Sequence, residues 1–131
     1  MPCLEISVPK LTLDNKKHLA KRLAEAFVSS TGMPAEIFGI RFNDYEIDDT
    51  ANGGNLWDGS GGKPYHHFVL YGGRLQCDVK KKLIESFSRV YTECLGKPDW
   101  KPVIFICELP YDNIGVEGKP LSEPSVKFTD S

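Results

Sequence analysis

The chain has 131 residues, 40% of them hydrophobic, and a formal net charge of −2 at pH 7. This length and apolar content suit one globular domain, and the charge argues against a nucleic-acid binder, which needs a basic surface. The sequence shows no secretory signal and no apolar run long enough to span a membrane. We therefore expect a cytoplasmic protein that does not bind membranes.

The first predicted element is a β-strand over residues 2–8, which opens on Pro2 directly after Met1. Aminopeptidases usually remove an initiator methionine that precedes proline, and the processed chain would begin with a secondary amine. An unperturbed α-amino group titrates near pH ~7.7–8.0. Burial or a nearby cation lowers that pKa, which would leave a neutral base at physiological pH. The alternative is that Pro2 only starts an edge strand, where no amide donor is needed.

A first helix is predicted from Thr12 or Asp14 to about Thr31. Gly32 can end it in the left-handed conformation, and Pro34 prevents its continuation. The apolar positions on one face of this helix are Leu19, Leu23, Ala26 and Phe27. Residues 37–43 then alternate in polarity, which predicts a strand with Arg41 on its polar face.

The second half repeats this order of elements. A polar linker over residues 57–63 leads to a strand that begins at Pro64, and a helix is predicted from about Asp78 to Leu95, with Gly96 as its stop. Residues 103–107 are a continuous apolar run, which suits a buried strand. Residues 122–131 are interpreted as a loose tail.

Local matches between the halves indicate an internal duplication. Pro2 is matched with Pro64, and Gly32-Met33-Pro34 with Gly96-Lys97-Pro98, if the second copy has a slightly longer first loop. We predict one domain over residues 2–121, built of two β-α-β units (2–56 and 64–121).

The duplication predicts an α+β fold. A helical crossover makes the two strands of each unit parallel, so two units give a four-stranded sheet with both helices on one face. The other face carries apolar groups and has no cover within the chain. A bare sheet face of this kind favours self-association.

A proline directly after Met1, followed by two fused β-α-β units of about sixty residues, resembles the tautomerase superfamily. The second half is similar to 4-oxalocrotonate tautomerase, and the fused chain more closely resembles the cis-3-chloroacrylic acid dehalogenase group. The stretches that carry the resemblance are Pro64-Tyr65, Gly73-Arg74, Gly96-Lys97-Pro98, Glu108-Leu109 and residues 113–118. It implies the fold shared with macrophage migration inhibitory factor and a homotrimer with pockets built around the N-terminal proline.

The resemblance also implies a reaction that needs neither metal nor cofactor. A neutral prolyl nitrogen can take a proton from an enol or from carbon next to a carbonyl, and return it at another carbon. The substrates would be small carboxylates such as 2-oxo acids, which an arginine can bind through two parallel hydrogen bonds. Pro2 is therefore the predicted catalytic residue.

Arg74 is the strongest candidate for the substrate carboxylate, because the family places a substrate-binding arginine in the equivalent Gly-Arg dipeptide. Arg41 is a weaker candidate, because it lies one strand repeat beyond the family's second arginine, where this chain has Gly39. Either arginine could instead be an ordinary solvated charge.

Several positions depart from the dehalogenase pattern. Phe27 stands where that group has a histidine, Phe105 replaces a tyrosine, and Val116 replaces the glutamate that activates water. Glu117 is adjacent and could reach the site through a one-residue bulge. That group has a pair of arginines before the second helix, and only Arg74 is present here. These departures favour tautomerisation over carbon–chlorine cleavage.

His66 and His67 are neighbours on a predicted strand, so their side chains point to opposite faces and at most one readily joins a given pocket. His67 is retained as a candidate, although a structural role explains either residue. The four cysteines and three histidines show no metal-ligand spacing.

Three functions of different class remain open at this stage. The first is an isomerase that uses Pro2. The second is a hydratase, dehalogenase or decarboxylase of small three-carbon acids, in which protonated Pro2 acts as an acid. The third is a non-catalytic or signalling member of the fold, which retention of Met1 would favour because the Pro2 nitrogen would then be an amide.

Overall fold

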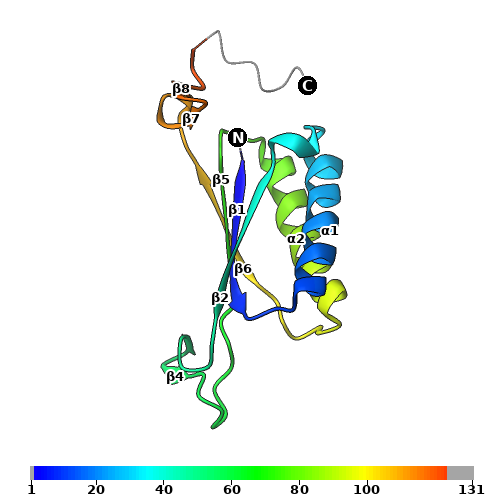
Figure 1. Cartoon of the computed structure of the whole chain (residues 1–131), viewed down its shortest axis with the longest axis vertical. Helices are drawn as coiled ribbons and strands as arrows, with labels where there is room; N and C mark the ends of the chain where they lie inside the picture. Colours follow the sequence, from blue (N-terminus) through cyan, green and yellow to red (C-terminus); the bar gives the residue numbers. More distant parts are fainter. Residues whose placement is uncertain (1, 124–131) are drawn as a thin grey trace.

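Four strands form one sheet, and two long helices lie side by side across one of its faces (Figure 1). The structure is a computed structural model that describes residues 2–123. The main elements are β1 (Cys3–Pro9), α1 (Leu13–Thr31), β2 (Gly39–Tyr45), β5 (His67–Gly72), α2 (Cys77–Leu95) and β6 (Val103–Glu108). The strand order is β2-β1-β5-β6, with β1 parallel to β2, β5 parallel to β6, and β1 antiparallel to β5. The predicted α+β fold and the predicted strand directions are confirmed.

The ends of the helices follow the predicted signals. Thr12 caps α1, because its side-chain oxygen accepts a hydrogen bond from the Asn15 amide at 3.1 Å. Gly32 ends α1 at φ 74° and Gly96 ends α2 at φ 62°, both in the left-handed region that glycine adopts without strain.

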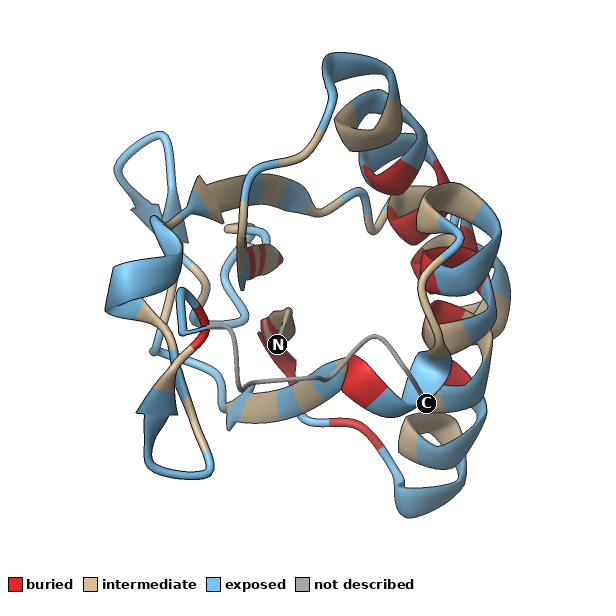
Figure 2. Cartoon of the chain, turned by 90° about the horizontal axis from the view of Figure 1, so that it is seen from above, coloured by how far each residue is buried: buried red, intermediate tan, exposed pale blue. Residues whose placement is uncertain are grey.

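The core fills the space between the sheet and the helices. Figure 2 shows buried positions along the strands and on the inner sides of both helices. Alternate residues of the central strands point inward, and each helix contributes an apolar stripe at helical spacing. The fully buried members are Leu4, Ile6, Val8, Leu19, Leu23, Phe27, Phe68, Leu83, Phe87 and Tyr91.

Corresponding elements of the two halves are separated by a constant 64 residues. β1 and β5 begin at Cys3 and His67, α1 and α2 at residues 13 and 77, and β2 and β6 at residues 39 and 103. The residue equivalent to Pro2 is thus His66, and the predicted match with Pro64 is wrong by two residues. The first loop of the second copy, residues 73–76, is one residue longer than residues 10–12 of the first copy, because β5 ends one residue earlier than β1 does in the repeat. Pro64 precedes β5 because it has no amide hydrogen to donate to a neighbouring strand.

Two small hairpins extend the repeat beyond the sheet. The first pairs β3 (Ala51–Asn52) with β4 (Asn55–Leu56), and the second pairs β7 (Gly115–Val116) with β8 (Lys119–Pro120). In both, the two turn residues have positive φ, which is the geometry of a tight two-residue hairpin. They project from opposite ends of the sheet (Figure 1).

The sheet face away from the helices is uncovered within the chain. Phe105 is 51% exposed on this face, and Tyr71 and Val103 are exposed beside it. Within residues 2–123, neither long helix is apolar enough over a sufficient length to cross a bilayer. Most of the predicted tail, residues 124–131, lies outside the described residues.

Candidate active site

Pro2 and Arg74 line the same cavity, although 72 positions separate them in the sequence. The cavity has a volume of about 130 Å³ and lies where β1 begins and β5 ends. Its other lining residues are Phe27, Met33, Ile37, Leu70, Gly72, Gly73, Leu75, Ile106, Tyr111 and Leu121. We call it the Pro2 cavity.

Contacts with the starting end of β2 and the final residue of β5 hold Pro2 in place. Its carbonyl accepts a hydrogen bond from the Gly39 amide at 3.0 Å, which ties it to β2. On the other side it packs against Gly72, where an added Cβ would lie 3.5 Å from the Cβ of Pro2. A proline nitrogen that is part of a peptide bond has no hydrogen to donate, so it takes no part in the hydrogen bonds of the sheet.

Glu108 fixes the loop that carries Arg74. Its carboxylate accepts hydrogen bonds from the Leu75 amide at 2.7 Å and from Lys80 Nζ at 3.1 Å. The Leu75 amide bond, the Lys80 ammonium and the nearby Arg74 charge lower the pKa of Glu108 below its usual value. The loop is also joined to the end of β6, because the Leu109 amide donates to the Gly72 carbonyl at 2.8 Å.

Gly73 lets Tyr111 approach the cavity. A Cβ at position 73 would overlap the ring atom Cε1 of Tyr111. Only a residue without a side chain therefore allows the Tyr111 ring to lie against the loop beside Arg74. Tyr111 is otherwise 49% exposed, so it forms part of the cavity's outer wall.

The described lining is apolar apart from one cation. Phe27 is fully buried and stacks on Phe38 with ring centroids 4.3 Å apart. The position at which the dehalogenase group has a histidine is therefore part of the core in this chain. The guanidinium of Arg74 is the only charged side chain among the lining residues. Such a cavity can hold an anionic group at one point and an apolar group elsewhere.

The other predicted site residues lie outside the Pro2 cavity. Arg41 pairs with Glu5 across β1 and β2 and projects from the uncovered sheet face. The His67 ring packs on Phe105, with centroids 5.3 Å apart. Glu117 is exposed in the turn of the β7–β8 hairpin at φ 53°, where the equivalent residue of the first half is Gly53.

Sequence reasoning did not identify several residues that line the cavity. Met33, Ile37, Tyr111 and Leu121 reach it from segments with no chemical motif. The sequence carries one signal for Tyr111. Two glycines, Gly72 and Gly73, precede Arg74, and the second of them is the position where a side chain would overlap Tyr111. Among the described residues, no group of three or more His, Cys, Asp or Glu side chains could hold a metal ion.

The second half of the chain, residues 64–123, matches the model of the family described as Tautomerase enzyme. This half of the chain belongs to the tautomerase superfamily, and the whole chain has the tautomerase fold. The chain is similar to native fused 4-OT, with 23% identity over 91% of this chain and 95% of that one and a TM-score of 0.83. The same identity and coverage relate it to Pt0534 inactivated by 2-oxo-3-pentynoate, with a TM-score of 0.80.

A member of the cis-3-chloroacrylic acid dehalogenase family, N1, is 17% identical over 94% of this chain and 85% of that one, with a TM-score of 0.74. Structures with the same fold include fused 4-OT proteins solved as asymmetric and symmetric trimers. No curated protein matches the sequence. With identities of 17–23%, these likenesses show a shared fold over most of the chain.

Proposed function

We propose that this protein is a cofactor-independent tautomerase in which the nitrogen of Pro2 moves a proton between two atoms of a small 2-oxo acid. The observation that carries the proposal is the placement of Pro2 and Arg74 on one small, largely apolar cavity. Arg74 would hold the substrate carboxylate through two parallel hydrogen bonds, and Pro2 would exchange the proton.

The proposal requires removal of Met1, because only then is the Pro2 nitrogen an amine with a usable lone pair. The apolar lining and the nearby guanidinium of Arg74 both disfavour a second positive charge. They would keep the amine neutral and able to accept a proton near pH 7. The protonated amine formed in the first half of the reaction then returns the proton at the other position.

The cavity supports a preference for short monocarboxylates. Its volume of about 130 Å³ is close to the ~150 Å³ of an engineered cavity that binds benzene. One guanidinium can hold one carboxylate, and the remaining lining favours an apolar substituent. A second carboxylate on the substrate would be desolvated without a partner among the described lining residues, which is costly.

The same lining favours proton transfer over hydrolysis. A hydratase or dehalogenase needs a group that activates water, and the described lining holds no carboxylate or histidine for that role. Phe27 occupies the corresponding wall as a buried aromatic residue. Tautomerisation needs only the prolyl nitrogen and an anchor for the substrate.

We further propose that the protein acts as a homotrimer. The uncovered sheet face exposes Phe105, Tyr71 and Val103, which is an unfavourable surface for an isolated chain. Fused 4-OT proteins of the same fold have been solved as trimers. Closed cyclic symmetry would cover this face in every subunit at once.

The availability of Pro2 can be tested by covalent labelling with 2-oxo-3-pentynoate, an electron-poor alkyne to which a neutral amine adds with retention of all reagent atoms. We expect intact-mass analysis to show loss of Met1 and gain of one reagent mass, and peptide mapping to place the adduct on Pro2. Arg74→Ala should slow labelling, whereas Arg89→Ala, on the exposed side of α2, should not. A retained Met1, or an adduct on cysteine alone, would contradict the proposal.

A further inference from the structure

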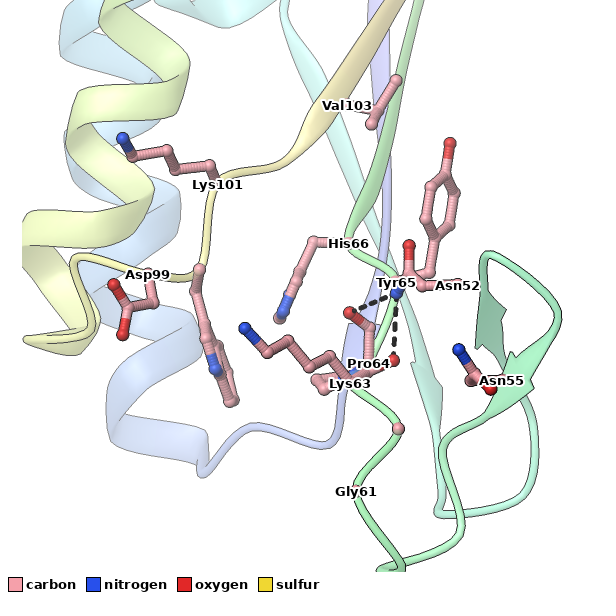
Figure 3. Close-up of a pocket in the computed structure, with 12 residues that line it drawn as sticks. Asn52, Asn55, Gly61, Lys63, Pro64, Tyr65, His66, Asp99, Lys101 and Val103 are labelled. Carbon is pink, nitrogen blue, oxygen red and sulfur yellow. Dashed lines mark hydrogen bonds between the residues drawn. The ribbon is translucent and has the colours of Figure 1, made fainter.

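A second and larger cavity lies at the opposite end of the sheet from Pro2. Its volume is about 690 Å³, and it is enclosed by the segment before β5, the β3–β4 hairpin and the loop before β6 (Figure 3). His66, Lys63 and Trp100 are among its lining residues. The volume lies within the range of about 300–1,000 Å³ that is usual for small-molecule sites. We call it the His66 cavity.

The 64-residue repeat relates this cavity to the Pro2 cavity. His66 stands where the first half has Pro2, and Tyr91 stands where it has Phe27. The duplicated fold therefore forms a cavity at each end of the sheet, one lined by a proline and one by an imidazole. The substitutions also exchange a buried phenyl ring for a phenol that can hydrogen bond.

His66 is a buried group whose ring is held on two sides. His66 is only 6% exposed, and its Nδ1 lies 2.8 Å from the Tyr91 hydroxyl. The Trp100 ring lies against it with centroids 4.5 Å apart. Desolvation lowers the pKa of His66 to about 4, so the ring is neutral near pH 7.

The hydrogen bond with Tyr91 determines which nitrogen carries the proton. Within residues 2–123 the Tyr91 hydroxyl has no other hydrogen-bond partner, and a buried hydroxyl is most stable when its proton is donated. It therefore donates to Nδ1, which leaves the hydrogen of the neutral ring on Nε2. Among the described residues, every fully buried side-chain nitrogen or oxygen has a hydrogen-bond partner. Nε2 of His66 has no such partner, so it is not fully buried and is accessible from the cavity that His66 lines.

Lys63 supplies a positive charge beside this donor. The side chains of Lys63 and His66 converge in Figure 3, whereas that of Lys101 points away toward the helices. The backbone that carries Lys63 is held by Asn52, whose amide donates to the carbonyls of Lys63 and Pro64 at 2.9 and 3.1 Å. These bonds fix the backbone from which the exposed Lys63 side chain extends.

We propose that the His66 cavity binds small planar monocarboxylates, with the carboxylate held by the Nε2–H of His66 and the ammonium of Lys63. One neutral donor and one cation match a single carboxylate. The Trp100 ring, which lies against His66, gives the wall its apolar character and suits the flat body of an aromatic acid. This site uses no residue of the Pro2 cavity, so it does not depend on the proposed tautomerase activity.

The test is a titration of the full-length protein with benzoate, followed through the imidazole nitrogen resonances. The chain has three histidines, so His66 can be assigned with a His66→Gln variant that is shown to remain folded. We expect a saturable shift of the His66 Nε2 resonance. Lys63→Ala should weaken benzoate binding roughly tenfold or more, because it removes a charge-assisted hydrogen bond.

Two further variants make the result specific. Lys82→Ala removes a lysine from the exposed surface of α2 and should leave benzoate binding unchanged. Pro2→Ala should also retain the His66 shift, which separates this site from the Pro2 cavity. The proposal is overturned if benzoate leaves the His66 resonance unmoved up to its solubility limit. It is equally overturned if Lys82→Ala weakens binding as much as Lys63→Ala, or if Pro2→Ala abolishes the shift.

Discussion

The carboxylate of Glu108 accepts a hydrogen bond from the backbone amide of Leu75 at 2.7 Å. This bond connects the end of β6 to the loop before α2, and the residue before Leu75 is Arg74. Glu108 thus holds the loop that carries Arg74, although it does not line the cavity itself. It is best described as a positioning residue.

Replacing Glu108 with glutamine should raise the KM for a 2-oxo acid more than it lowers kcat. The glutamine side chain keeps the size of the group but weakens the bonds to Leu75 and Lys80, so Arg74 would be less well placed for the carboxylate. Steady-state kinetics of enol loss would measure both constants. Equal effects on KM in Glu108→Gln and in the surface control Glu85→Gln would contradict this role.

The lowered pKa of Glu108 predicts an acid-dependent contribution to stability. The ionised Glu108 carboxylate is more stable in the folded state than in the unfolded state. Its contribution to the free energy of unfolding is therefore present above the ordinary pKa of 4.5 and is lost as pH falls through the lower pKa of the folded state. Urea unfolding below pH 5 should therefore show a steeper loss of unfolding free energy in wild type than in Glu108→Gln. Parallel curves would contradict the prediction.

Removal of the Arg74 guanidinium should weaken substrate binding while the protein stays folded. Arg74→Ala is expected to lower kcat/KM by a factor that corresponds to a loss of about 1.5–3 kcal/mol in transition-state stabilisation, the usual contribution of a hydrogen bond to a charged group. Arg74→Lys should recover only part of the loss, because an ammonium cannot form two parallel bonds to a carboxylate. Arg89→Ala is the matched control on the exposed side of α2. Full activity in Arg74→Ala would exclude Arg74 as the anchor.

Gly73→Ala tests whether the position of the Tyr111 ring depends on the absence of a side chain at residue 73. The added methyl group would overlap the ring, so either the ring or the Arg74 loop must move. We expect a loss of stability of about 1–3 kcal/mol, near the lower end because Tyr111 is half exposed and can rotate outward. Gly115→Ala, whose nearest contact would be an ordinary 3.9 Å, is the control. Equal thermal unfolding of the two variants would contradict this account.

His66 predicts a second pH effect in a different range. Its pKa falls from 6.5 in a solvated chain to about 4 in the folded protein, so between these values the unfolded state binds more protons. Folding stability should therefore decrease as pH falls from 6.5 toward 4. His66→Phe, which cannot titrate, should lose less stability over this interval in urea unfolding. An identical pH dependence in both proteins would show that His66 is not the responsible group.

The fold could be predicted largely because its signals are local. Thr12, Gly32 and Gly96 mark helix ends through capping and left-handed geometry, which depend on a few neighbouring residues. The start of β5 was less predictable. Pro64 imitates Pro2 in sequence, but the strand begins at His67 because of pairing with β1 and β6, which are distant in the chain.

The site was only partly predictable for the same reason. Pro2 and Arg74 stand in recognisable motifs, and the structure brings them to one cavity; their roles remain predictions. Arg41 was a candidate because it lies one strand repeat beyond the family's second arginine, and His67 because of its imidazole. Their strand registers place both on the uncovered face. Tyr111 and Leu121 carry no motif, so their part in the cavity follows only from tertiary packing.

The central claim is that the Pro2 nitrogen transfers the proton. The most direct measurement is the ultraviolet loss of the enol of phenylpyruvate, compared with that of a shorter 2-oxo acid, in wild type and Pro2→Ala of confirmed mass and oligomeric state. Our account predicts that Pro2→Ala lowers kcat/KM by a factor of about 10²–10⁴, the usual contribution of a general acid–base group. Wild-type activity in Pro2→Ala, with Met1 removed from both proteins, would contradict it.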